Sequence, residues 1–76
     1  MGSPEEHVNG IVERVVFHSE ESGFGVLRIK AQGHRDLVAV VGTVPSVNAG
    51  EWVDARGRWQ MDARHGRQFK ADQLRV

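Results

Sequence analysis

The chain has 76 residues, with ten Lys and Arg against ten Asp and Glu, and it contains no cysteine. This length supports one small domain, which buries only about 60% of its unfolded surface, so a self-contained nucleotide-hydrolysing enzyme is not expected. The absence of cysteine excludes disulfides and thiolate metal sites and makes the cytoplasm the expected compartment. The longest apolar run, residues 37–41, is far shorter than the ~20 residues of a membrane helix, so no membrane contact is expected.

The balanced net charge hides a difference between the two parts of the chain. Residues 1–55 carry four Lys and Arg against eight acids, a net charge of −4, whereas residues 56–76 carry six against two, a net charge of +4. Eight of the ten cations are Arg, whose planar group suits bidentate phosphate contact and stacking on flat rings. The basic segment is either a nucleic-acid footprint or a solvated strand face.

Residues 1–7 are polar, include a proline and show no periodicity, which predicts a disordered tail or residues added for expression. The remaining domain, residues 8–76, shows short β patterns separated by turn signals, and no helical stripe of useful length. The predicted strands are residues 10–18, 24–31, 37–43, 51–59 and 67–76, and the segment 60–66 is predicted to be a loop.

Two strands change the phase of their alternation, which predicts β-bulges. In the first strand two polar residues follow Val12, and in the last strand Phe69 and Leu74 have opposite parity, so a bulge is expected near Asp72 or Gln73. Bulges and interior glycines bend a small sheet enough to close it. The sequence therefore predicts an all-β fold, a small five-stranded OB-like barrel (oligonucleotide/oligosaccharide-binding).

The motifs that would indicate catalysis or metal binding are missing. There is no P-loop motif, and the four histidines are scattered without metal-ligand spacing. Glu20 and Glu21 fall in a predicted turn, where nothing would raise a carboxyl pKa for acid–base work. We therefore assign no catalytic residue, no metal site and no cofactor to these residues.

Cationic side chains instead gather where an OB barrel binds single strands, namely on strands two and three and in the loops around them. We define a predicted cationic track: Arg28 and Lys30 on strand two, His34 and Arg35 in the loop after it, Arg64 and His65 in the loop after strand four, and Arg67 and Lys70 on strand five.

Each member has a simpler interpretation. Arg28 and Lys30 project together from residues 24–31, and they either bind phosphate or solvate the outer face, paired with Glu13 or Asp36. The arginines near residues 60–66 also suit a polar turn. Phe24 either stacks on a base or caps the barrel core.

The two tryptophans have opposite parity in residues 51–59. Trp59 shares parity with Val53 and is predicted to be core, whereas Trp52 lies on the outer face with Arg56 and Arg58. Trp52, Arg56 and Arg58 form either a stacking platform or, as we favour, a surface that docks on another domain.

A linked set of motifs resembles one known module. It comprises ERVxFHxEExGFxVLRxK, DLVxVVG, VPxVxxGE and HGRQFKA, spread over residues 9–76. This set is similar to the amino-terminal OB-like domain of RecD-like, YrrC-type ATP-dependent DNA helicases. Each motif is weak alone, and the combination is specific.

The resemblance implies a parent protein much larger than these residues. It would be a bacterial superfamily 1 helicase related to the exodeoxyribonuclease V alpha subunit, with a role in DNA repair and recombination. ATP and Mg²⁺ would bind in downstream motor domains that move 5′ to 3′ along single-stranded DNA. The resemblance assigns no catalytic residue here. The expected partners are single-stranded DNA or, alternatively, the motor domains of the same protein or another partner.

Overall fold

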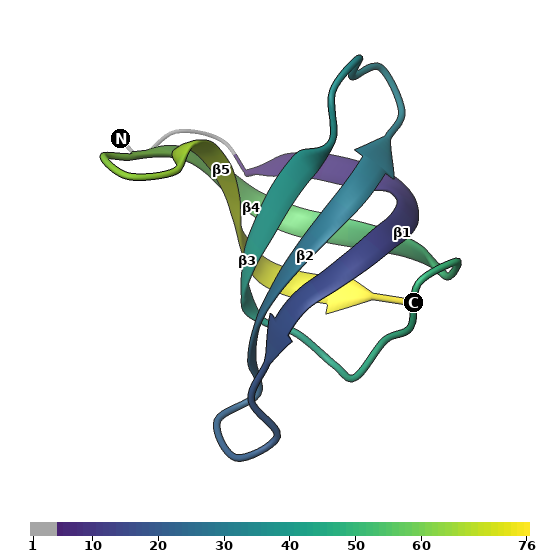
Figure 1. Ribbon diagram of the computed structural model, residues 1–76. Helices are drawn as coiled ribbons and strands as arrows, with labels where there is room; N and C mark the ends of the chain where they lie inside the picture. The colour runs from purple at the N-terminus through teal and green to yellow at the C-terminus, as the bar shows by residue number, and fades with distance from the viewer. Residues whose placement is uncertain (1–4) are drawn as a thin grey trace.

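Five strands close into a barrel in the computed structural model, which describes residues 5–76 (Figure 1). The strand order around the barrel is β1-β2-β3-β5-β4; β3 and β5 pair in parallel, and all other pairs are antiparallel. This confirms the predicted all-β, OB-like barrel. The strands are β1 (Glu6–His18), β2 (Phe24–Ala31), β3 (Val38–Thr43), β4 (Trp52–Asp62) and β5 (Gly66–Arg75).

Two strands are longer than predicted. β1 begins at Glu6, because Glu6 and His7 pair with Gly57 and Arg56 of β4; the rest of the predicted tail before Glu5 lies outside the described residues. The loop predicted for residues 60–66 is wrong, since β4 continues to Asp62 and only residues 63–65 turn before β5. Each extension contains one apolar residue among polar ones, the buried Val8 in β1 and the exposed Met61 in β4, so neither shows the apolar alternation that reveals a strand in sequence.

The predicted bulges are present at both phase changes. In β1 the register with β2 shifts between Val12 and Arg14 and again between Val15 and Phe17. In β5 the register with β4 leaves Asp72 without a partner, as expected. Each extra residue increases the local bend and twist of its strand, which allows five strands to curl into a closed surface.

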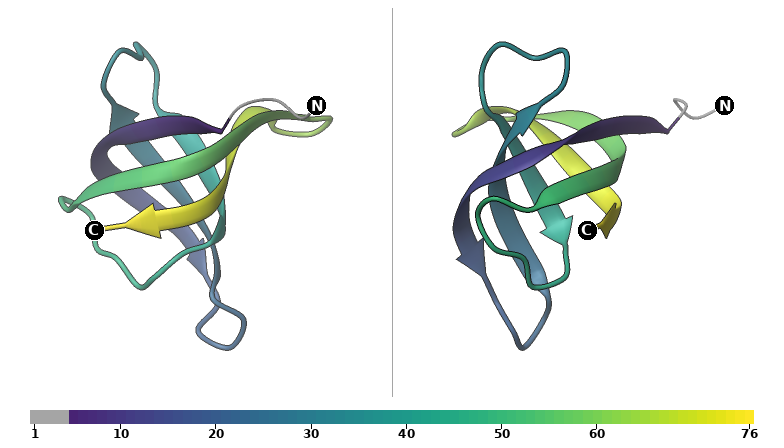
Figure 2. Two further views of the ribbon diagram at one scale, coloured as in Figure 1. Left: turned by 180° about the vertical axis from the view of Figure 1, so that it is seen from behind. Right: turned by 90° about the vertical axis from the view of Figure 1, so that its right-hand side faces the viewer.

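Apolar side chains fill the barrel, and no buried polar or charged residue occurs in residues 5–76. Leu27, Ile29 and Phe69 are fully buried in its centre. The lower end of the barrel is closed by the β3–β4 connection, which crosses it (Figure 2) and inserts Val44 and Val47 into the core. Residues 5–76 contain no helix with the length and apolarity needed to span a bilayer.

The β2–β3 loop and the β1–β2 turn project from opposite ends of the barrel (Figure 1). The β4–β5 hairpin lies at the same end as the β2–β3 loop, because β3 and β5 are parallel and both begin there. The rings of His34 in that loop and Trp59 on β4 have centroids 5.4 Å apart, so the two connections meet. We call this end of the barrel its mouth.

Closure requires glycine at position 57. A Cβ at Gly57 would overlap the Lys70 carbonyl oxygen and lie 2.9 Å from the Ala71 Cα. We expect Gly57→Ala to lower the free energy of unfolding by more than about 2 kcal/mol, since two backbones would have to separate. Urea denaturation measures the change. The control is Gly33→Ala in the exposed β2–β3 loop, where φ is +80° but nothing lies within 4 Å of the new Cβ; a loss of about 1 kcal/mol is expected there. Equal losses would contradict the prediction.

Candidate nucleic-acid interface

A groove runs over the outer face of β2 and β3 toward the β4–β5 hairpin. Most of its lining is apolar, and its polar side chains are Gln68 and three members of the predicted cationic track, Arg28, His65 and Arg67. We call it the outer groove, lined by Val16, Val26, Arg28, Leu37, Ala39, His65, Arg67 and Gln68. The structure thus brings together three predicted residues, Arg28, His65 and Arg67, from two distant parts of the chain.

Arg28 has a second arginine beside it. Arg14 and Arg28 are directly opposed partners in the β1–β2 register, and both are exposed. Opposed side chains are about 5 Å apart at Cβ, and like charges there destabilise the sheet. Glu13 lines the same hollow as the two arginines, but neither ion pair in residues 5–76 contains an arginine or lysine; the two join His7 to Asp54 and His65 to Asp62. The predicted pairing of Arg28 with Glu13 or Asp36 is therefore absent, and both guanidinium groups are available for an anion.

Two phenylalanines stand at the other end of the groove. Phe24 is 43% exposed and Phe17 is 52% exposed, with ring centroids 6.3 Å apart. Phe24 therefore does not cap the core, because it faces water beside Phe17. Val26, the partner of Phe17 in the sheet, lines the groove, and four residues of extended strand put Phe24 about 13 Å from Arg28. The outer groove therefore has two arginines in its lining, and two exposed aromatic rings lie on the same face beyond Val26.

A second hollow opens at the mouth, next to the outer groove. We call it the mouth pocket; its volume is about 260 Å³, and its lining shares Leu37 and Arg67 with the groove. The guanidinium carbon of Arg67 lies 4.0 Å from the centroid of the Trp59 ring, and the buried Phe69 packs edge-on against the same indole at 5.1 Å. Cation–π contact fixes a flexible arginine in place. The pocket is lined by His34, Arg35, Asp36, Leu37, Val38, Trp59 and Arg67.

The β4–β5 hairpin beside the groove is held by one carboxylate. Oδ2 of Asp62 accepts a hydrogen bond from the backbone N–H of His65 at 2.9 Å and another from its ring Nδ1–H at 2.6 Å. The His65 ring is the main cause that lowers the pKa of Asp62 below its ordinary value of 3.8. These bonds orient the short turn that places His65 in the groove.

The other members of the predicted track lie apart from the outer groove. His34 and Arg35 line the mouth pocket. Arg64 is exposed in the β4–β5 turn. Lys70 lies opposite Arg58 in the β4–β5 register and shares a separate hollow with it and Asp72. Lys30 is the partner of Ile11 in β1, which in turn pairs with Trp52.

The predicted docking residues lie on a different side of the barrel. Trp52 is 46% exposed and lies opposite Ile11, itself 42% exposed, in the β1–β4 register. Arg56 and Arg58 follow on the same outer face of β4 and are exposed. A cross-strand pair of exposed apolar side chains with cations beside it forms a small apolar surface. We call the Ile11–Trp52 pair with Arg56 and Arg58 the β4 face.

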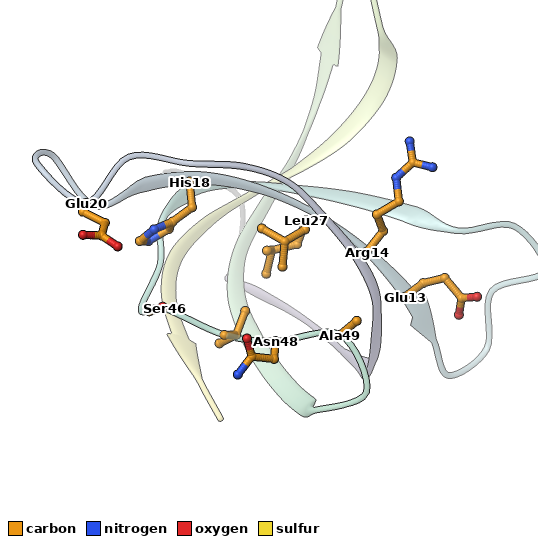
Figure 3. Close-up of a pocket in the computed structure, with 10 residues that line it drawn as sticks. Glu13, Arg14, His18, Glu20, Leu27, Ser46, Asn48 and Ala49 are labelled. Carbon is orange, nitrogen blue, oxygen red and sulfur yellow. The ribbon is translucent and has the colours of Figure 1, made fainter.

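The largest remaining hollow lies at the end of the barrel opposite the mouth and does not suit DNA (Figure 3). Glu20 and His18 line one end of it and Glu13 and Arg14 the other, above the β3–β4 connection. Two carboxylates oppose phosphate there, and the His18 ring Nε2 is within hydrogen-bond distance, 3.2 Å, of the Val44 carbonyl oxygen. Within residues 5–76, no three His, Asp or Glu side chains gather as a metal site requires.

Sequence reasoning missed three residues of the interface. Arg14 and Phe17 follow the two β1 bulges, which displace the simple alternation and turn both side chains outward. Trp59 does share parity with the core, but it lies near the end of β4 where the barrel opens, so it is only partly buried. The adjacent polar pair Glu13–Arg14 within an apolar strand was the one available signal of a bulge in the first strand.

The closed barrel, its order of strands and the groove over β2 and β3 define an OB-fold domain. The family model for the OB-fold domain of the ATP-dependent DNA helicase YrrC matches residues 5–76, and the chain belongs to this family. The predicted resemblance is confirmed. No curated protein and no solved structure matches the chain.

The Asp62–His65 contact has a measurable consequence in acid. Because the folded-state pKa of Asp62 is below 3.8, the contact stabilises the fold above that pH, and its contribution is lost as pH falls through the folded pKa. We expect His65→Ala to raise the Asp62 pKa toward 3.8, as followed by the carboxyl carbon shift in an NMR titration. Arg64→Ala is the control, since Arg64 acts on Asp62 through its backbone. A pKa that does not move in His65→Ala would contradict this assignment.

Proposed function

We propose that this domain binds single-stranded DNA without sequence preference, along the outer groove, as a non-catalytic module of a RecD-like helicase. The observation that carries the proposal is the Arg14–Arg28 pair, two directly opposed cations without a carboxylate partner. A phosphate between them removes their repulsion and forms charge-assisted hydrogen bonds. His65 and Arg67 extend the cationic lining to the β4–β5 hairpin.

Base contacts follow from the same surface. Phe17 and Phe24 offer exposed aromatic faces at one end of the groove, and stacking is worth about 1–3 kcal/mol per base on any sequence. The chain has zero net charge, so long-range attraction is weak. Affinity in the isolated domain is therefore expected to be in the micromolar range and to fall with salt.

The parent protein follows from the family. We infer a cytoplasmic, ATP-dependent superfamily 1 helicase related to the exodeoxyribonuclease V alpha subunit, active in DNA repair and recombination, with ATP and Mg²⁺ in its motor domains. Family membership supports this inference. The barrel would hold the single strand near the motor while the motor hydrolyses ATP.

The test is a fluorescence-anisotropy titration with labelled oligo-dT at low and moderate salt. We expect Arg28→Ala to weaken binding about tenfold at low salt and to reduce the slope of log K against log salt by about 0.7, the effect of one lost phosphate contact. Arg56→Ala is the matched control on the β4 face, with little expected change. Equal effects of the two substitutions would place the DNA outside the groove, and no binding by the folded wild-type domain would refute the function.

The β4 face supports a second function, docking on the motor domains of the same protein. The exposed Ile11–Trp52 pair favours this, because apolar side chains that face each other across strands gain from being covered. We expect Trp52→Ser in the full-length helicase to speed proteolysis between the barrel and the motor and to leave oligo-dT binding by the isolated domain unchanged. Met61→Ser, at an apolar residue that is 75% exposed elsewhere on β4, should change neither. Unchanged proteolysis in Trp52→Ser would remove the docking role.

A further inference from the structure

The mouth pocket differs in character from the outer groove that it adjoins. It is lined by one carboxylate, Asp36, by the guanidinium groups of Arg35 and Arg67, and by the Trp59 indole, which packs against the buried Phe69. A flat ring would meet the apolar side chains of Leu37 and Val38 and the stacked planar groups around Trp59. The lining therefore suits a planar group.

Arg67 is held flat at the boundary between the two hollows. Its guanidinium carbon lies 4.0 Å above the Trp59 ring, and Trp59 is supported from inside by Phe69, which is fully buried. One face of the guanidinium is thus covered by the indole. Arg67 itself is exposed, so its other face is accessible from the pocket and the groove.

The His34 ring stands beside this stack. Its centroid is 5.4 Å from that of Trp59, with the two planes 41° apart. His34 lies in the β2–β3 loop and Trp59 on β4, so the site is assembled from both connections at the mouth. Aromatic rings and guanidinium planes are the groups on which proteins stack unpaired bases.

We propose that the mouth pocket holds one nucleobase of the bound strand, stacked on the outer face of the Arg67 guanidinium with the His34 ring alongside. The inference rests on the proposed function, since the base arrives with a strand whose phosphates lie in the outer groove. Leu37 and Arg67 belong to both hollows, so the strand passes from one to the other without leaving the surface. Every base has a π face. The pocket therefore binds a base more tightly than an abasic site, and it does not distinguish one base from another.

The experiment compares oligo-dT with an oligonucleotide of equal length that contains abasic sites, which keeps the phosphates and removes the bases. A Trp52→Phe background leaves Trp59 as the single fluorophore, because the chain has two tryptophans. We expect oligo-dT to bind about tenfold more tightly than the abasic strand, and only oligo-dT to change the Trp59 emission. Anisotropy measures binding of both strands independently of Trp59.

Arg67→Lys separates stacking from charge, because lysine keeps the positive charge and lacks the planar group. We expect it to weaken oligo-dT binding several-fold and abasic binding much less; Arg56→Lys on the β4 face, outside both hollows, is the matched control and should retain the difference between the strands. Equal affinity for both strands, with unchanged Trp59 emission, would overturn the base pocket and leave DNA binding intact. If neither strand binds the folded domain, the proposed function is overturned and the pocket with it.

Discussion

Closing a sheet of only five strands bends it sharply, and at two positions this brings the backbones of neighbouring strands into direct contact. Gly10 pairs with both Ala31 and Val53, and Gly57 pairs with both Glu6 and Ala71. A side chain at either glycine would overlap a carbonyl oxygen of the adjacent strand. The bulge opposite Gly57 and those in β1 supply the curvature that brings these crossings together. The surfaces described above depend on this closure, because it decides which outward side chains become neighbours.

The same closure separates the cations into two groups. Arg28 on β2 lies opposite Arg14 of β1 in one hollow and lines the outer groove with Arg67, so it links the two. Arg58 on β4 and its partner Lys70 on β5 lie in a separate hollow with Asp72. The basic residues of the segment 56–76 are thus divided, with Arg67 in the outer groove and Arg58 and Lys70 outside it.

The sequence predicted the fold well because the fold depends on local signals. Alternation placed Leu27 and Ile29 inside and Arg28 and Lys30 outside, and the phase change near Asp72 revealed a bulge before any pairing was known. The site was harder to predict, since it depends on register. No rule of alternation places Lys30 beside Ile11 or Arg14 opposite Arg28; these neighbours arise only once the β1 bulges have shifted the pairing.

Trp59 shows a different limit of sequence reasoning. Parity states which face of the sheet a side chain occupies, and Trp59 does face inward. Parity does not state how far along the barrel axis that side chain lies. At the mouth an inward side chain reaches water, where Arg67 and His34 from two other segments meet it.

The parallel joint between β3 and β5 involves only residues 40–42 and 69–71, whereas β4 and β5 pair from Asp54 to Asp62. This short β3–β5 pairing, which we call the seam, closes the sheet into a barrel. Leu37 and Ala39 lie on the β3 side of the seam, and Arg67 and Gln68 on the β5 side, so the outer groove crosses it. The DNA strand proposed to bind in the groove would contact both sides of the seam, and a ligand bound only by the closed barrel stabilises it against opening. In the proposed helicase, whose motor would pull on the same DNA strand, tighter DNA binding would also raise the resistance of the domain to mechanical unfolding.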